Sequence, residues 1–215
     1  KLLAHLSKKN SISLLDIETK KNIHSIVIDP EDKHSQISSF SLNPDGKHLA
    51  VSNLQGNITI WDYVNNKIIS SFKHARSNVC NACDKPINSL IHSSNGKYLV
   101  SSSKDKTVKV WNLENHQLIH TFSDEENKTS AIAISPNNNT LATAQSSGKI
   151  RLLDIENKKL IQEITVDHNK NYKKMSIAFS PDGEDIAIIK NSSTLSLWNI
   201  KKKLIVKEKS GHRKP

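Results

Sequence analysis

Ile60-Trp61-Asp62-Tyr63 is one of five versions of a single short motif in this chain of 215 residues. The other versions begin at residues 14, 110, 152 and 197 and read Leu-Leu-Asp-Ile, Val-Trp-Asn-Leu, Leu-Leu-Asp-Ile and Leu-Trp-Asn-Ile. The position held by Trp61 recurs at steps of 46, 50, 42 and 45 residues. A nearly fixed period of this length is typical of repeat proteins, in which each unit is one small motif that stacks on its neighbours.

Each repeat contains short runs in which apolar and polar residues alternate, and such alternation predicts β-strands. The first two runs of a repeat are separated by turn residues such as Asn43-Pro44-Asp45-Gly46 and Ser180-Pro181-Asp182-Gly183. These segments predict tight hairpins, because Gly and Asn accept a positive φ and Pro presets the first corner. No stretch shows a sustained helical period. The sequence therefore predicts an all-β chain of four-stranded antiparallel sheets.

This repeat resembles that of the WD40 family, and the resemblance covers essentially the whole chain. It implies a β-propeller region with about four complete blades plus three strands of a leading blade. Rings of this family generally have six to eight blades, most often seven, so we expect the missing blades to come from absent sequence or from a partner. The expected boundaries are 1–33 for the partial blade, 34–74, 83–124, 127–168 and 171–209 for complete blades, and 210–215 for the start of a further blade.

The family often joins a His, a Ser or Thr, an Asp and the Trp of a repeat by buried hydrogen bonds. His74, Ser101, Asp105 and Trp111 come closest to this pattern. Elsewhere the turn Asp and the Trp are replaced, which indicates a divergent propeller; the replacing residues are Gln55, Ser147 and Ser192, and Leu15 and Leu153. The residues to which we assign a structural role in the repeat are Trp61, Asp62, Asp105, Trp111, Asp154 and Trp198.

The carboxylates of Asp16, Asp62 and Asp154 follow the Trp position in three separate repeats. Tens of residues separate them, so we do not interpret them as a catalytic pair. We expect each carboxylate to accept backbone hydrogen bonds from the turn that follows it.

An insertion, Ala75–Pro86, lengthens one connection between blades and holds the only cysteines of the chain, Cys80 and Cys83. Three interpretations stay open: inert thiols, a disulfide or redox pair, and part of a metal site to which His74 or Asp84 contributes. Zinc normally takes four ligands, and no second Cys-x-x-C exists. The sequence thus assigns no metal and no cofactor.

The chain carries a net charge of +10. Many lysines fall in the turns between third and fourth strands, and the resemblance places these turns on one face of the propeller. The candidate partner-binding residues are Lys20, Lys21, Lys67, Lys158, Lys159, Lys201, Lys202 and Lys203. Because nucleic-acid readers usually interleave aromatic and basic residues, and only 5% of residues here are aromatic, direct nucleic-acid binding is disfavoured.

No nucleophile elbow, phosphate-binding glycine loop or His-Glu-x-x-His motif is found, so we expect no enzyme. No apolar run approaches the length of a membrane-spanning helix. The compartment stays open, with the cytoplasm favoured over the periplasm. The resemblance implies a protein–protein interaction scaffold that displays its loops within a multiprotein assembly. The alternative is a redox- or metal-associated accessory propeller, periplasmic and linked to a respiratory metalloenzyme, that uses the Cys80/Cys83 loop.

Overall fold

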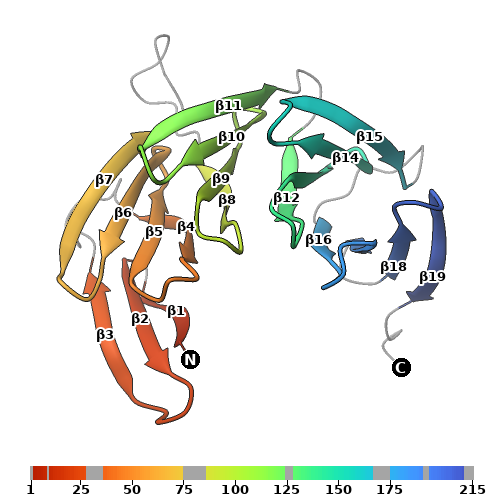
Figure 1. Cartoon of the computed structure of the whole chain (residues 1–215). Coiled ribbons are helices and arrows are strands. Elements are labelled where there is room, and N and C mark those ends of the chain that lie inside the picture. Colours follow the sequence, from red (N-terminus) through yellow and green to blue (C-terminus); the bar gives the residue numbers. More distant parts are fainter. Residues whose placement is uncertain are drawn as a thin grey trace.

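The computed structural model describes residues 2–8, 10–27, 36–74, 86–123, 128–166, 175–190 and 194–210, and these ranges form 19 strands and no helix. The strands build five antiparallel sheets, one of three strands and four of four strands. The sheets stand side by side in an arc (Figure 1). The prediction of an all-β chain of antiparallel blades is therefore confirmed, whereas the seven-blade ring stays a prediction.

The five sheets are numbered here as blades 1 to 5. Blade 1 consists of β1 (Leu2–Lys8), β2 (Ser11–Asp16) and β3 (Asn22–Val27). Blade 2 consists of β4 (Ile37–Leu42), β5 (His48–Asn53), β6 (Asn57–Asp62) and β7 (Lys67–Lys73). Blade 3 consists of β8 (Ile87–His92), β9 (Tyr98–Ser103), β10 (Thr107–Asn112) and β11 (Gln117–Ser123). Blade 4 consists of β12 (Thr129–Ile134), β13 (Thr140–Gln145), β14 (Lys149–Asp154) and β15 (Lys159–Thr165). Blade 5 consists of β16 (Met175–Phe179), β17 (Asp185–Lys190), β18 (Thr194–Asn199) and β19 (Leu204–Ser210).

In each four-stranded blade, neighbours in the sequence are neighbours in the sheet. The first strands β4, β8, β12 and β16 lie on the inner side of the arc and contact one another in turn (Figure 1). The last strands β7, β11, β15 and β19 lie on the outer side (Figure 1). Every four-stranded blade therefore has the same order of strands from the inner to the outer side of the arc. Equivalent positions in the repeats can be compared directly.

The turns between first and second strands follow the chemistry that the sequence predicts. Gly46, Gly96 and Gly183 have φ angles of 65°, 71° and 74°, and Asn138 takes the same place with a φ of 62°. At Gly96 the positive φ disfavours other residues, and a Cβ there would lie 2.7 Å from Asn43 Oδ1 in the turn of blade 2. The turns of neighbouring blades therefore approach closely, which helps to fix one blade against the next.

The Trp position is marked by the same irregularity in all five blades. The pairing of the third with the fourth strand shifts register at Leu14/Leu15, Ile60/Trp61, Val110/Trp111, Leu152/Leu153 and Leu197/Trp198. A β-bulge of this kind bends the strand and increases its local twist. The bulge gives the Trp position the same backbone setting whether Trp or Leu occupies it.

The hydrophobic core lies between the blades. Each of four apolar clusters draws buried side chains from two neighbouring sheets, as when Ile12 and Leu14 of blade 1 pack with Leu49 of blade 2. A single blade cannot bury both of its faces, so this stacking is the main source of hydrophobic stability.

Candidate functional site

The junction between blades 2 and 3 is filled by stacked rings. The Trp111 indole lies on the Phe72 ring, with 4.9 Å between centroids. Trp111 is 5% exposed and Phe72 is 8% exposed. His74, which follows β7, is fully buried beside them. These three rings are thus buried together between blades 2 and 3.

A chain of hydrogen bonds runs through the same junction. The Trp111 indole N–H donates to Ser101 Oγ at 2.9 Å, and Ser101 Oγ lies 2.7 Å from His74 Nδ1. His74 Nε2 lies 2.8 Å from Thr107 Oγ1, and that hydroxyl donates to Asp105 Oδ1 at 2.7 Å. Because a carboxylate only accepts, the hydroxyl of Thr107 donates to Asp105 and accepts the Nε2–H of His74.

Asp105, at the acidic end of this series of hydrogen bonds, is ionised. Burial raises the pKa of Asp105, but the hydrogen bonds from His74 and Thr107 outweigh it and bring the pKa to about 2. The four residues that the sequence grouped, together with Thr107, thus form one buried polar network. Both ring nitrogens of His74 are engaged in it, so a metal could bind His74 only if one of these hydrogen bonds broke.

Two other junctions lack the hydroxyl of this network. Val51 in blade 2 and Ile188 in blade 5 hold the register position that Ser101 holds in blade 3. The indole N–H groups of Trp61 and Trp198 are buried without a hydrogen-bond partner. The Trp of these blades therefore packs in a junction that is apolar where blade 3 is polar.

The junction between blades 3 and 4 lacks the Trp itself. Leu153 takes the Trp position, Thr143 takes the position of Ser101, and Phe122 takes that of Phe72. A cleft of about 340 Å³ opens there between the two blades. Phe122 is only partly buried, whereas Phe72 is covered by Trp111. The cleft thus lies where an indole lies in the preceding junction.

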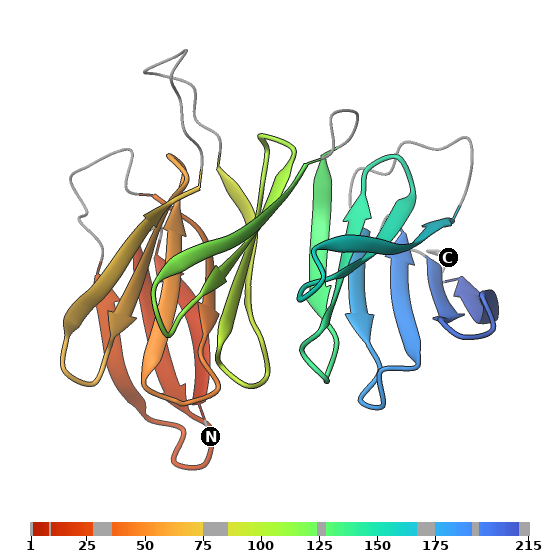
Figure 2. The same ribbon diagram turned by 45° about the horizontal axis from the view of Figure 1, so that its top comes forward.

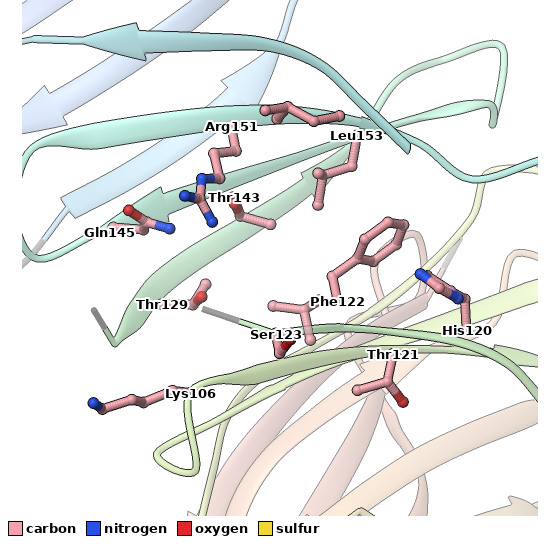
Figure 3. A pocket seen from close by; sticks show the side chains of 12 residues that line it. Lys106, His120, Thr121, Phe122, Ser123, Thr129, Thr143, Gln145, Arg151 and Leu153 are labelled. Atoms are coloured by element: carbon pink, nitrogen blue, oxygen red, sulfur yellow. The ribbon is translucent and has the colours of Figure 1, made fainter. Parts of the chain in front are cut away.

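The walls of this cleft differ from one end to the other. Figure 3 shows Phe122 and Leu153 near the His120 ring at one end. It shows Lys106, Gln145 and Arg151 toward the other end. The buried hydroxyl residues Thr129 and Thr143 line the cleft between blades. The cleft therefore combines an aromatic and aliphatic end with a polar, basic end.

The basic end of the cleft contains a cluster of ion pairs. Arg151 Nε donates to Glu163 Oε2 at 2.9 Å, and Lys149 Nζ lies 3.1 Å from Glu163 Oε1. Hydrogen bonds from Arg151 and then Lys149 lower the pKa of Glu163, so this carboxylate is ionised. One carboxylate is thus shared by two cations, and Lys106 also lines the cleft.

The aromatic end holds a neutral ring. His120 meets Phe122 edge to face, with 4.5 Å between centroids. Burial lowers the pKa of His120, and the nearby charge of Lys158 lowers it further. An uncharged His120 extends the apolar surface of Phe122.

The lysines that the sequence singled out lie on a different surface. We call it the turn face: the sheet ends that hold the turns between first and second strands and between third and fourth strands. Figure 2 shows these turns together at one end of blades 1 to 3. It bears ten lysines, which are Lys20, Lys21, Lys47, Lys67, Lys97, Lys158, Lys159, Lys201, Lys202 and Lys203. It also bears ten carboxylates, which are Asp16, Glu18, Asp45, Asp62, Glu114, Asp154, Glu156, Asp182, Glu184 and Asp185.

The turn face is therefore rich in lysine and balanced in charge. Lys201 pairs with Glu184 at 2.5 Å and Lys97 pairs with Glu114 at 3.5 Å. A second cleft, of about 440 Å³, lies at this face between blades 2 and 3, and both Asp45 and Lys97 line it. The excess of basic residues among the described residues lies elsewhere, with eleven Lys or Arg against Asp105, Glu163 and Glu208.

The carboxylates after the Trp position serve the turns. Asp62 accepts the backbone N–H of Asn65 at 2.9 Å, and Asp154 accepts that of Asn157 at 2.7 Å. In blade 1, Asp16 accepts the backbone N–H of Thr19 at 2.7 Å. Each carboxylate holds a turn whose later residue has a positive φ, such as Lys158 at 57°.

Cys80 and Cys83, which the insertion contributes, lie outside the described residues. Within the described ranges, no group of three or more His, Cys, Asp or Glu side chains is placed to hold a metal ion. The same ranges contain no helix that is long and apolar enough to span a membrane.

Sequence reasoning missed the cleft between blades 3 and 4, although its signal is present. Leu153 stands where three other repeats have Trp, while Phe122 and Thr143 keep the ring and the hydroxyl that would surround an indole. We interpreted this replacement only as divergence. The basic residues Lys106 and Arg151 gave no separate signal, because they lie on different blades.

Two family models match the chain. The first, described as the WD40 domain, a G-beta repeat, matches residues 72–112. The second, described as the anaphase-promoting complex subunit 4 WD40 domain, matches residues 1–83 and 123–177, which together make up more than half of the chain. A search of curated proteins finds no match. Together with the five antiparallel blades, the matches show that this chain belongs to the WD40-repeat family.

Proposed function

We propose that this chain is a non-enzymatic scaffold that binds other proteins within a multiprotein assembly. WD40 repeats are generally protein-interaction scaffolds, and the family is typically non-enzymatic. The family model that covers most of the chain is named after a subunit of a complex, the anaphase-promoting complex. This name supports a role as one component of an assembly.

The observation that carries the proposal is the rigid coupling of the blades. Backbone N–H groups of Leu90 and His92 in β8 donate to Ser39 Oγ and Ser41 Oγ of β4, each at 3.1 Å. Asn88 Nδ2 donates to the carbonyl of Thr129 in β12 at 3.1 Å. A surface held in this way loses little conformational entropy when it binds a partner.

Two surfaces are available for partners. The turn face presents the lysines that the sequence singled out, interspersed with carboxylates, and this pattern suits a partner of mixed charge. The cleft between blades 3 and 4 presents an apolar end and a basic end. The redox- or metal-associated alternative depends on Cys80 and Cys83, outside the described residues, and neither the described residues nor the family matches support it.

Co-purification tests the proposal. The intact protein would be tagged and isolated under native conditions from its own cells, and its partners identified and quantified by mass spectrometry. We expect at least one protein in near-stoichiometric amount, and we expect the double variant Lys158→Glu/Lys159→Glu to reduce the recovery of any partner that uses the turn face. Absence of any stoichiometric partner, together with turnover of a substrate that one point variant abolishes, would contradict the scaffold function.

A further inference from the structure

We propose that the contact between Ser41 and His92 makes the junction of blades 2 and 3 open locally in acid, and that this opening weakens partner binding at the turn face. The second step rests on the proposed function, because it names a way in which binding to that face is regulated. The opening itself is a property of the junction, so it can be tested without a partner.

The contact joins the first strands of two neighbouring blades. Ser41 lies in β4, and His92 is the last residue of β8. Ser41 Oγ accepts the backbone N–H of His92 at 3.1 Å and lies 2.9 Å from His92 Nδ1. Two residues earlier, Leu90 donates its backbone N–H to Ser39 Oγ at 3.1 Å. Serine hydroxyls thus carry these hydrogen bonds across the inner side of the junction.

The same place is apolar in the two junctions that follow. Ile91 and Ile134 hold these positions between blades 3 and 4, and Ala133 and Phe179 hold them between blades 4 and 5. Among the first strands that the structure describes, β8 alone ends on an ionisable side chain. The junction of blades 2 and 3 therefore has a polar contact where the other two have apolar ones.

The closed junction cannot accommodate a second proton on the His92 ring. His92 is 7% exposed, and its Nε2 has no hydrogen-bond partner among the described residues. A neutral imidazole has one N–H, whereas an imidazolium has two. Protonation would therefore bury a charge and leave its Nε2–H without an acceptor, which is strongly unfavourable. An open junction admits water, which solvates the charged ring.

The groups around His92 do not reverse this preference. Burial lowers the pKa of His92 to about 4; the charge of Asp45 raises it and that of His48 lowers it. Asp45 Oδ2 and His48 Nδ1 lie 2.5 Å apart, so this carboxylate is already engaged. Of the other strands against β8, β4 and β12 carry no ionisable side chain and β9 carries only Tyr98. The charge on His92 thus has no free counterion in the closed junction.

Acid therefore shifts the junction toward its open form. In the open form His92 takes up a proton near its ordinary pKa of 6.5, and in the closed form only near 4. The preference that His92 gives to the closed form is complete above about pH 6.5 and is lost as the pH falls to about 4. The ratio of open to closed junction is expected to rise about twentyfold between pH 7 and pH 5.

The turns that follow these two strands form walls of the second cleft, the one between blades 2 and 3 at the turn face. Asn43 comes from the turn of blade 2, and Asn95 and Gly96 come from the turn of blade 3. The turns approach so closely that a Cβ at Gly96 would lie 2.7 Å from Asn43 Oδ1. When the strands before them separate, these walls separate as well. A partner that spans both turns therefore binds the closed junction more tightly.

Amide hydrogen exchange of the purified protein, resolved by NMR, tests the opening. The backbone N–H groups of Leu90 and His92 bond to hydroxyls across the junction, so their exchange reports on its opening. After correction for intrinsic exchange rates, we expect their protection to fall about twentyfold from pH 7 to pH 5. The most protected amides of the β12–β13 pair report global unfolding and should be at least about tenfold more protected.

The dependence on denaturant separates local opening from global unfolding. Local opening exposes little surface, so exchange of Leu90 and His92 should change by less than about twofold in about 1 M urea. The reference amides in blade 4 should exchange clearly faster in the same urea, because global unfolding exposes the whole core.

Two variants that do not titrate provide the matched controls. His92→Leu places at this position the residue that Leu42 provides in blade 2. His92→Gln keeps a polar side chain and serves if the first variant repacks. In both variants the twentyfold change should shrink to less than about threefold. His48→Gln removes the nearby titrating ring and should retain most of the change.

Co-purification at pH 7 and pH 5 tests the effect on partners. We expect a partner held at the turn-face cleft to be recovered at least about twofold less at pH 5 from the wild-type protein. The recovery with His92→Leu should be the same at both pH values. Equal recovery from the wild-type protein at both pH values would overturn the regulatory step.

Three results would overturn the opening: protection of Leu90 and His92 that does not change with pH, the same change in both non-titrating variants, or exchange at the rate of global unfolding. If partners co-purify while any of these is found, only this proposal fails. If the opening is observed and no partner co-purifies at all, the scaffold function fails and the acid-sensitive junction stands.

Discussion

The junction between blades 2 and 3 and the junction between blades 3 and 4 share one backbone plan and differ in what fills it. In the first, Trp111 stacks on Phe72, and Ser101 joins Trp111 to His74 by hydrogen bonds. In the second, Leu153 replaces the Trp and a cleft remains. The bulge at the Trp position is present in both. The difference teaches that the repeat backbone does not require the Trp, so a blade can lose this residue and keep its fold.

The remaining junctions show a second way to depart from the plan. Blades 2 and 5 keep the Trp but place Val51 and Ile188 where blade 3 has Ser101. Their indole N–H groups are buried without a partner, and apolar side chains surround them. Burial of an unpaired donor is unfavourable by about 1 to 3 kcal/mol, and the extra apolar packing offsets this cost.

The largest effect is expected when the filled junction is made to resemble the open one. Trp111→Leu removes the stacking on Phe72 and leaves Ser101 Oγ without its donor. We expect the free energy of unfolding to fall by about 3 to 4 kcal/mol, from the cavity and the broken network together. Urea unfolding of the purified variant measures this. Lys202→Gln serves as a surface control. If Trp111→Leu lowered the free energy of unfolding no more than this control, the stacked rings would not be what holds these blades together.

A pH dependence of nearly the same size is expected from the filled junction. His92 of β8 is buried, its Nδ1 lies 2.9 Å from Ser41 Oγ, and burial lowers its pKa to about 4. In the unfolded chain His92 takes up a proton near its ordinary pKa, so the unfolded state binds more protons between the two values. The contribution of His92 to the free energy of unfolding is therefore fully present above about pH 6.5. It decreases by about 3 kcal/mol as the pH falls to about 4.

Unfolding curves at several pH values test this dependence, with His92→Leu as the control. The corresponding positions of the open junction are the apolar Ile91 and Ile134, which do not titrate. We expect the variant to lose most of the slope between pH 6.5 and 4. An unchanged slope would assign the acid sensitivity to other groups.

Filling the open junction should have a smaller effect in the opposite direction. Leu153→Trp places an indole between Phe122 and Thr143, where the cleft now lies. We expect a gain of about 1 to 2 kcal/mol in the free energy of unfolding, as is common when a cavity is filled. Thermal and urea unfolding measure the gain, with Leu160→Trp at the half-exposed outer edge of the cleft as the matched control. A loss of stability would mean that the space is not shaped for an indole.

The smallest change restores a hydroxyl to an apolar junction. Val51→Thr would give the buried indole N–H of Trp61 an acceptor while keeping the shape of the side chain. We expect a gain of about 0.5 to 1 kcal/mol if the hydrogen bond forms, the net value of a typical buried bond. A decrease on urea unfolding would indicate that the apolar packing around Val51 outweighs the new bond.

The fold could be predicted from the sequence because its signals are local. The alternating runs around Leu49 and Leu99 and the turns that contain Gly46 and Gly183 each specify strands and hairpins without knowledge of distant residues. The five repeats then require that these hairpins stack. The number of blades in the ring depends on contacts beyond this chain and stays a prediction.

The candidate site could be predicted only in part, because it depends on pairs of blades. The grouping of His74, Ser101, Asp105 and Trp111 followed from the family pattern, and hydrogen bonds join these residues through Thr107. The cleft needs Lys106 of one blade next to Arg151 of the next, and no sequence spacing reveals that proximity. The emphasis on the turn-face lysines also overlooked how evenly carboxylates accompany them.

The most direct test of the relation between the two junctions is a double-mutant cycle at the open one. Leu153→Trp, Thr143→Val and the double variant would be compared with the wild-type protein by urea unfolding. If the cleft is the empty counterpart of the Trp111 site, the new indole donates to Thr143 and the two substitutions couple by about 1 kcal/mol. A coupling indistinguishable from zero, with Leu153→Trp no more stable than the wild-type protein, would contradict the equivalence of the two junctions.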